Sequence, residues 1–300
     1  MKSLFISIAM VAVLTACGHR ASTDSNTEAD SLSVDSIEAL KVDSIGVERS
    51  DSMAGVEVFV DWPVSGSPEL TEAIRHYICT ELAARPFQEE SAKPQFTDNA
   101  KQAVSETVKD IYKSLSTSWK EARDEGYGGD MSYSYFQSVF LLESNERYVT
   151  YMTNSEGFMG GAHGFATSSG ITFSTKTGRK ISYQSEYDAQ KETFVLKEQT
   201  LFKDTESAQF RKIIKEGVRS YFKEYENVVT DSQLKDMLLG IDNVNNIPLP
   251  SNAPFFTKDG LFFSYQQYEI APYAAGMPSF SVKYDKIRPY LTDEAAELIP

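Results

Sequence analysis

The chain has 300 residues, of which 41% are hydrophobic, and its 43 acidic and 29 basic residues give a net charge of −14. This negative charge argues against nucleic acid as a partner and against direct adsorption to an anionic lipid surface. The composition suits a folded domain whose partners are neutral glycans or cationic proteins.

Residues 1–16 have the features of a bacterial lipoprotein signal peptide. Lys2 supplies a positive charge, a short apolar run follows, and the segment Leu-Thr-Ala-Cys ends at Cys17. The apolar run is shorter than the roughly 20 residues of a transmembrane helix. We therefore expect lipidation of Cys17 with several acyl chains, palmitate among them, which together anchor a protein stably. An ordinary cleaved signal peptide is the alternative.

With this lipid anchor, the mature protein would be held at a bacterial membrane, with the outer membrane favoured. It would face the periplasm or the cell surface, and the N-terminal lipid would be its only contact with the membrane. Lipidation also uses one of the two cysteines, so Cys79 would have no partner for an internal disulfide.

Residues 17–55 are rich in Ser and Asp and contain no aromatic residue. Such a segment has too little apolar surface to offset the entropy of ordering it, so we predict a disordered acidic tether. The pattern Asp-Ser-aliphatic occurs four times and resembles the acceptor motif of an O-glycosylation system in some Gram-negative envelopes. The candidate O-glycosylation sites are Ser31, Ser36, Ser44 and Ser52. A plain Asp/Ser linker is the alternative.

The folded part is predicted to begin at Val56, where valines at alternate positions indicate a strand. The segment Ser67-Pro68-Glu69 is typical of a helix start, because it combines a capping hydroxyl, a proline at the first helical position and an acid in the first turn. A second helix is predicted over 98–123, where apolar residues recur at helical spacing.

From residue 133 the apolar period changes to two, which predicts an antiparallel meander with strands near 133–143, 148–152, 171–173 and 181–183. Further amphipathic helices are expected over 210–222 and 231–240. A hairpin through the turn Lys258-Asp259-Gly260 and one more strand complete the C-terminal end. The predicted class is α+β, with the meander and the hairpin packed against helices. We expect one domain over 56–300. If this domain consists of two lobes, they are 56–125 and 126–300.

Two stretches are candidates for a binding surface. The first is the glycine-rich turn over 160–164, and the second is the loop Tyr-Glu-Ile-Ala-Pro-Tyr-Ala-Ala-Gly over 268–276. Each has two interpretations. The turn either fixes its own backbone or lets a ligand approach backbone amides, and the loop is either a packed aromatic corner or a surface for sugar or protein. The candidate ligand-binding residues are Gly160, Gly161, His163, Tyr268, Glu269, Pro272 and Tyr273.

The sequence shows no motif of a catalytic or metal site. Its three histidines are far apart, no Cys/His ligand spacing occurs, and both the Gly-x-Ser-x-Gly motif and phosphate-binding glycine loops are missing. We therefore expect no metal, no cofactor and no catalytic residue, and the protein is predicted not to be an enzyme. A pair of carboxylates acting on envelope glycans is the alternative, because such pairs are formed only by folding.

The turn Gly160-Gly161-Ala162-His163, followed about a hundred residues later by the loop 268–276 and the strand Ser281-Val282-Lys283-Tyr284, resembles a known family. The similar domains are the extracytoplasmic domain of RsiV, a lysozyme-sensing anti-sigma factor, and the domain before the catalytic domain of the peptidoglycan deacetylase PdaC. Envelope lipoproteins of unknown function also look like stand-alone versions. The resemblance covers 56–291. It implies lysozyme binding in the sensor and an accessory role near peptidoglycan in the deacetylase.

This sequence contains neither a sigma-binding segment with a transmembrane helix nor a deacetylase domain, so signalling and deacetylation are not expected of it. We expect a non-catalytic, lipid-anchored envelope protein that binds a cell-envelope ligand. The two ligand classes are a cationic lysozyme-like hydrolase and peptidoglycan or another glycan. An enzyme or accessory module acting on envelope glycans is the alternative.

Overall fold

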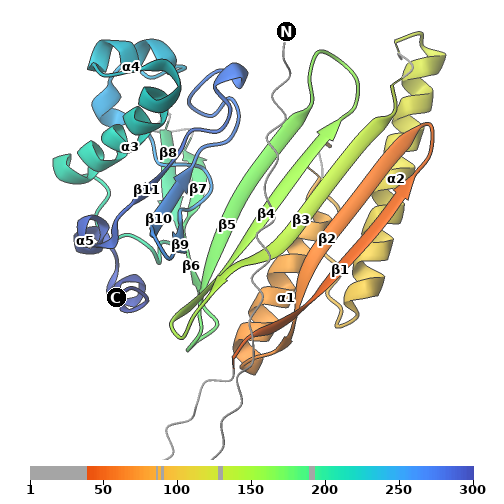
Figure 1. Cartoon of the computed structure of the whole chain (residues 1–300), viewed down its shortest axis with the longest axis horizontal. Coiled ribbons are helices and arrows are strands. Elements are labelled where there is room, and N and C mark those ends of the chain that lie inside the picture. Colours follow the sequence, from red (N-terminus) through yellow and green to blue (C-terminus); the bar gives the residue numbers. More distant parts are fainter. Residues whose placement is uncertain (1–38, 86, 89–90, 128–130, 189–192) are drawn as a thin grey trace, which may run out of the picture. The chain divides into compact units, whose positions relative to one another are not determined.

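The fold is taken from a computed structural model that describes residues 39–85, 87–88, 91–127, 131–188 and 193–300 (Figure 1). The predicted signal peptide, Cys17 and the candidate glycosylation sites Ser31 and Ser36 lie outside the described residues. Within the described part of the chain, no helix is long and apolar enough to cross a membrane.

A six-stranded sheet forms the first half of the fold, with the strands in the same order in space as in the sequence. Neighbouring strands pair antiparallel except β2 and β3, which pair parallel, from Ala54 opposite Tyr133 to Val60 opposite Val139. The strands are β1 (Lys41–Ser50), β2 (Ala54–Ser65), β3 (Tyr133–Ser144), β4 (Tyr148–Phe158), β5 (Phe165–Ser174) and β6 (Lys180–Ile181).

Two helices connect β2 to β3 and lie along one face of this sheet (Figure 1). Helix α1 (Pro68–Ala83) begins as predicted, with the Ser67 hydroxyl accepting a hydrogen bond from the Leu70 N–H. Helix α2 (Ala100–Asp124) begins at the side-chain cap of Asn99. Their apolar faces cover the buried valines of β2 and form one hydrophobic core with them.

Strand β1 differs from the expectation that residues 17–55 form a disordered tether. Ile45 and Val47 pack against the core beneath α2, while Ser44 and Glu48 alternate with them on the opposite face. Asp51 closes the hairpin, because its carboxylate accepts hydrogen bonds from the N–H groups of Met53 and Ala54. The ordered fold therefore includes residues 41–55, because one row of aliphatic side chains facing a core is enough to hold an edge strand.

The second half of the fold contains a three-stranded sheet, in the order β11-β10-β9, and a separate hairpin of β7 and β8. The strands are β7 (Gln184–Asp188), β8 (Thr193–Lys197), β9 (Phe255–Thr257), β10 (Gly260–Ser264) and β11 (Ser279–Val282). The helices are α3 (Ala208–Glu226), α4 (Asp231–Met237), α5 (Tyr284–Ile287) and α6 (Asp293–Glu297), with 3-10 turns at Val244–Asn246, Tyr273–Ala275 and Arg288–Tyr290.

The two halves have separate hydrophobic cores, and the boundary differs from the predicted division at residue 125. Strands β3, β4 and β5 pack into the same core as α1 and α2, so the first core extends to Phe173. The second core is built mainly from residue 181 onward and also includes Tyr148 at the start of β4. The α+β class, the meander and the C-terminal hairpin are confirmed.

Glu81 lies in the last turn of α1, near the Thr153 hydroxyl of β4. Burial raises the pKa of Glu81 above that of an exposed glutamate, although the Thr153 hydroxyl favours the charged form. The folded state therefore holds the proton to higher pH than the unfolded chain. Stability from this group is present below the unfolded pKa and is lost as pH rises through the folded pKa.

We expect the free energy of unfolding to be lower at pH 8 than at pH 5, and Glu81→Gln to make this difference smaller. Burial also raises the pKa of Glu269, so Glu269 contributes to the pH dependence of the unfolding free energy in both the native chain and the Glu81→Gln variant. Urea titrations at the two pH values measure the effect, with the exposed Glu121→Gln as the control. An unchanged slope in Glu81→Gln would rule out a protonated Glu81 in the folded state.

Candidate functional site

The glycine turn joins β4 to β5 at one end of the large sheet. Gly160 and Gly161 have φ angles of +85° and +83°, so both occupy a conformation that side chains other than glycine rarely adopt. His163 follows, and its Nδ1 donates a hydrogen bond of 2.8 Å to the carbonyl oxygen of Gly164. Since a carbonyl can only accept, Nδ1 carries the proton, and in a neutral ring Nε2 is left as an acceptor.

The loop over 268–276 is fixed from inside by the carboxylate of Glu269. Its two oxygens accept hydrogen bonds from the N–H of Gln266, at 2.7 Å, and from the N–H of Ser251, at 2.5 Å. The neighbouring residues Ile270 and Ala271 are buried in the second core. Glu269 therefore holds the loop in place, and its carboxylate is occupied by backbone donors. The preceding residue Tyr268 has a φ of +64° and projects outward, 56% exposed.

The second half of the fold is attached to β5 beside the glycine turn. The amide of Gln266 accepts from the N–H of Ser168 and donates to the carbonyl of the same residue, at 3.1 and 2.6 Å. Gln267 accepts from the N–H of Ala166 at 3.0 Å. These two side chains therefore bind backbone groups of β5 that a neighbouring strand would otherwise bind. The attachment places the loop over 268–276 directly against the turn over 160–164.

Three of the predicted residues consequently form one exposed cluster, the aromatic corner, made of His163, Tyr268 and Tyr273. The Tyr273 ring stacks on the His163 imidazole with centroids 3.9 Å apart, and its hydroxyl donates to the Gly164 carbonyl at 3.1 Å. The Tyr268 hydroxyl lies 3.4 Å from Nε2 of His163. The rings pack on each other, while Tyr268 and His163 also face solvent.

A cavity of about 560 Å³ adjoins the aromatic corner, and Gly164 and Tyr273 belong to its lining. We call it the acidic groove. It runs over the sheet face opposite α1 and α2 and is lined by three carboxylates from three strands, and its described lining residues include no Lys or Arg. The carboxylates are those of Glu48 on β1, Glu57 on β2 and Glu156 on β4, with the Phe136 ring among them.

Strand register explains why these carboxylates come together. Glu48 lies opposite Glu57, Glu57 opposite Phe136, and Phe136 opposite Glu156, so the four side chains form one row across the sheet. All three glutamates are exposed, and within the described part of the chain none of them has a hydrogen-bond or ion-pair partner. Like charges directly opposite each other destabilise a sheet. The row therefore carries an uncompensated negative charge.

The remaining candidates lie at different places. Pro272 is exposed at the start of the 3-10 turn beside the aromatic corner. Ser44 is in β1, where its hydroxyl donates to Asp61 at 2.6 Å, and Ser52 is in the turn after β1. The sequence prediction missed Glu48, Glu57 and Glu156, and also the glutamines that attach the loop. The described residues contain no group of three or more His, Cys, Asp or Glu side chains suited to holding a metal ion.

Residues 199–285 match the model of a family described as "Protein of unknown function (DUF3298)". A DUF3298 family protein from Bacteroides fragilis has a TM-score of 0.61 and 18% identity, covering 87% of this chain and 98% of that one. One from Pseudomonas aeruginosa has a TM-score of 0.53 and 14% identity, covering 89% and 98%. A comparison with curated proteins found no match. The chain thus carries a DUF3298 domain at residues 199–285 and shares its fold with two solved DUF3298 proteins.

Proposed function

We propose that this protein is a non-catalytic, lipid-anchored envelope protein that binds a cationic, lysozyme-like hydrolase. The observation that supports this most is the row of three unpaired glutamates in a groove beside an exposed aromatic corner. A cationic surface would neutralise the row, and aromatic side chains at the rim supply the contact area that protein interfaces favour. This ligand agrees with what the resemblance to the RsiV domain implies. Cys17 is the proposed lipid attachment site.

The test is calorimetric titration of the full chain, purified in detergent, with lysozyme at low and moderate salt. We expect binding that weakens as salt is added, because exposed charges of opposite sign attract each other less when they are screened. The triple variant Glu48→Gln, Glu57→Gln, Glu156→Gln should bind about ten-fold more weakly. The matched control, Glu121→Gln, Glu125→Gln, Glu224→Gln, removes the same charge from exposed helix-terminal positions outside the groove lining and should bind as the native chain does.

Binding that both triple variants lose equally would mean attraction to net charge and would contradict a specific site. A complete lack of lysozyme binding would also overturn the proposal.

A glycan is the second candidate ligand, because an exposed tyrosine beside a stacked imidazole and tyrosine offers ring faces to a sugar. Peptidoglycan fragments are the probe in a parallel titration. This candidate predicts binding that changes little with salt, that Tyr268→Ala abolishes, and that the glutamate triple variant leaves intact. Fragment binding unaffected by Tyr268→Ala would exclude the aromatic corner as a glycan site.

A further inference from the structure

A second and larger cavity lies in the C-terminal half, with a volume of about 1,410 Å³. We call it the basic groove. It is lined by the first half of α3, the β7–β8 hairpin and the segment over 240–249, and it shares no lining residue with the acidic groove. Pockets for single small molecules measure about 300–1,000 Å³, so this groove has room for an oligomer.

The charges in the basic groove do not cancel. Each of the three carboxylates among its described lining residues has a partner. Asp204 accepts from the N–H groups of Glu206 and Ser207, Glu206 pairs with Arg211 at 2.6 Å, and Asp242 pairs with Lys235 at 3.4 Å. Lys203 and Lys212 also line the groove and are exposed, and within the described ranges neither ammonium group has a partner. Asp204 keeps its charge, because its partners are neutral N–H groups. The four basic and three acidic side chains among the described lining residues therefore give a net charge of +1, with two unpaired ammonium groups, in a protein of net charge −14.

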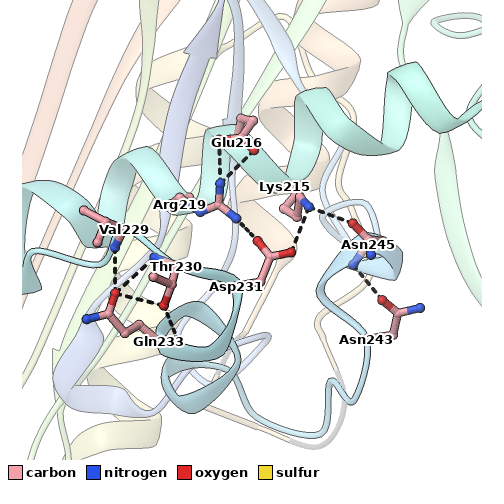
Figure 2. A network of polar contacts seen from close by, with 9 residues as sticks. All are labelled: Lys215, Glu216, Arg219, Val229, Thr230, Asp231, Gln233, Asn243 and Asn245. Atoms are coloured by element: carbon pink, nitrogen blue, oxygen red, sulfur yellow. Dashed lines mark hydrogen bonds and ion pairs between the residues drawn. The ribbon is translucent and has the colours of Figure 1, made fainter.

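One wall of the groove is held in place by a polar network that leaves hydrogen-bond donors free (Figure 2). Asp231 accepts from both Lys215 and Arg219 of α3, and Lys215 also donates to the side-chain oxygen of Asn245 at 2.7 Å. The side-chain oxygen of Asn243 accepts from the N–H of Asn245. Because both asparagine oxygens are used within the fold, their NH₂ groups remain as donors at the groove.

We infer that the basic groove binds an acidic oligosaccharide, a glycan chain that carries carboxylate or phosphate groups. Two free ammonium groups and a set of amide donors suit a ligand rich in anionic oxygens and hydroxyl acceptors. The half-buried side chains of Val195, Leu196, Ile241 and Leu249 supply apolar contacts for the sugar rings. Single-stranded nucleic acid is disfavoured, because Phe202, the only aromatic residue among the described lining residues, is 2% exposed and offers no ring for base stacking.

The test is calorimetric titration of the full chain with an oligogalacturonate, an oligomer of glycerol phosphate, and neutral maltohexaose. We expect one of the two anionic probes to bind with a stoichiometry of one and maltohexaose to give no binding. The anionic probe that binds identifies the carboxylate or the phosphate as the recognised group. The double variant Lys203→Gln, Lys212→Gln should weaken binding at least about ten-fold, since hydrogen bonds to charged groups are the strong ones.

The matched control is Lys223→Gln, Lys286→Gln, which removes the same charge at exposed positions outside the groove lining. It should bind within about two-fold of the native chain. Three outcomes would overturn the inference: no binding of either anionic probe, equal binding of maltohexaose, or equal losses in both double variants. None of these results depends on lysozyme binding at the acidic groove, so the two sites are tested separately.

Discussion

A chain that begins at Ser52 should fail to fold cooperatively, whereas one that begins at Ile37 should unfold as the full chain does. The shorter chain loses β1 and the preceding Leu40, and with them the partly buried side chains of Leu40, Val42, Ile45 and Val47 that pack against the first core. Half-burial of four such side chains contributes about 3–6 kcal/mol, and whole domains are stable by only about 5–15 kcal/mol. Urea unfolding followed by circular dichroism measures the difference.

Two point variants test the same strand without shortening the chain. Val47→Asp places a charge on the face that packs against the core, and Ser50→Asp places one on an exposed residue of the opposite face. We expect Val47→Asp to lower the urea midpoint strongly and Ser50→Asp to leave it almost unchanged. Equal midpoints for the two chain lengths would mean that β1 adds nothing to the fold.

Gly217→Ala is the second variant for which we expect a large loss of stability. Gly217 lies inside α3, and a Cβ atom there would come within 2.2 Å of the Phe280 ring of β11. That ring is buried and stacks on Phe263, with centroids 4.9 Å apart, so it has no room to move away. Alanine in a helix interior is normally about 1 kcal/mol more favourable than glycine. Overpacking of a core costs about 1–3 kcal/mol, and because the Phe280 ring is so close we expect the upper end of this range, a net loss of about 2 kcal/mol.

A double-mutant cycle with Phe280→Leu separates overpacking from other effects. The smaller leucine leaves space for the new methyl group, so the penalty of Gly217→Ala should shrink in that background. Gly46→Ala is the control, since a Cβ there meets only the Phe59 side chain at an ordinary 3.8 Å. A stabilising Gly217→Ala would mean that α3 stands farther from β11 than the structure shows.

The sequence allowed most of the elements to be predicted, but β1 was missed for a physical reason. Ile45 and Val47 alternate with polar residues, which is the pattern of a half-buried strand, yet they lie in a segment dominated by Ser and Asp. The average composition of the forty-residue segment hides an alternating apolar and polar pattern that spans only about five residues. An edge strand with one face on the core needs few apolar residues, so averages of this kind underestimate it.

The candidate site was predicted only in part, for a related reason. The glycine turn and the loop over 268–276 were recognisable because each contains unusual residues in sequence. Their contact depends on Gln266 and Gln267 reaching β5, which only the folded chain shows. The acidic groove depends on the register of Glu48, Glu57 and Glu156 across separate strands. Local patterns carry no information on the register between β2 and β3, since two helices intervene.

The parallel pairing of β2 with β3 also affects how the chain is made. Translation completes β2 at Ser65 but reaches the end of its partner only at Ser144. At 5–20 residues per second, this interval lasts roughly 4 to 16 s. Throughout it the valine-rich β2 has an unpaired edge, which is a template for aggregation between nascent chains. We expect β2 to be the segment that a chaperone must shield during synthesis.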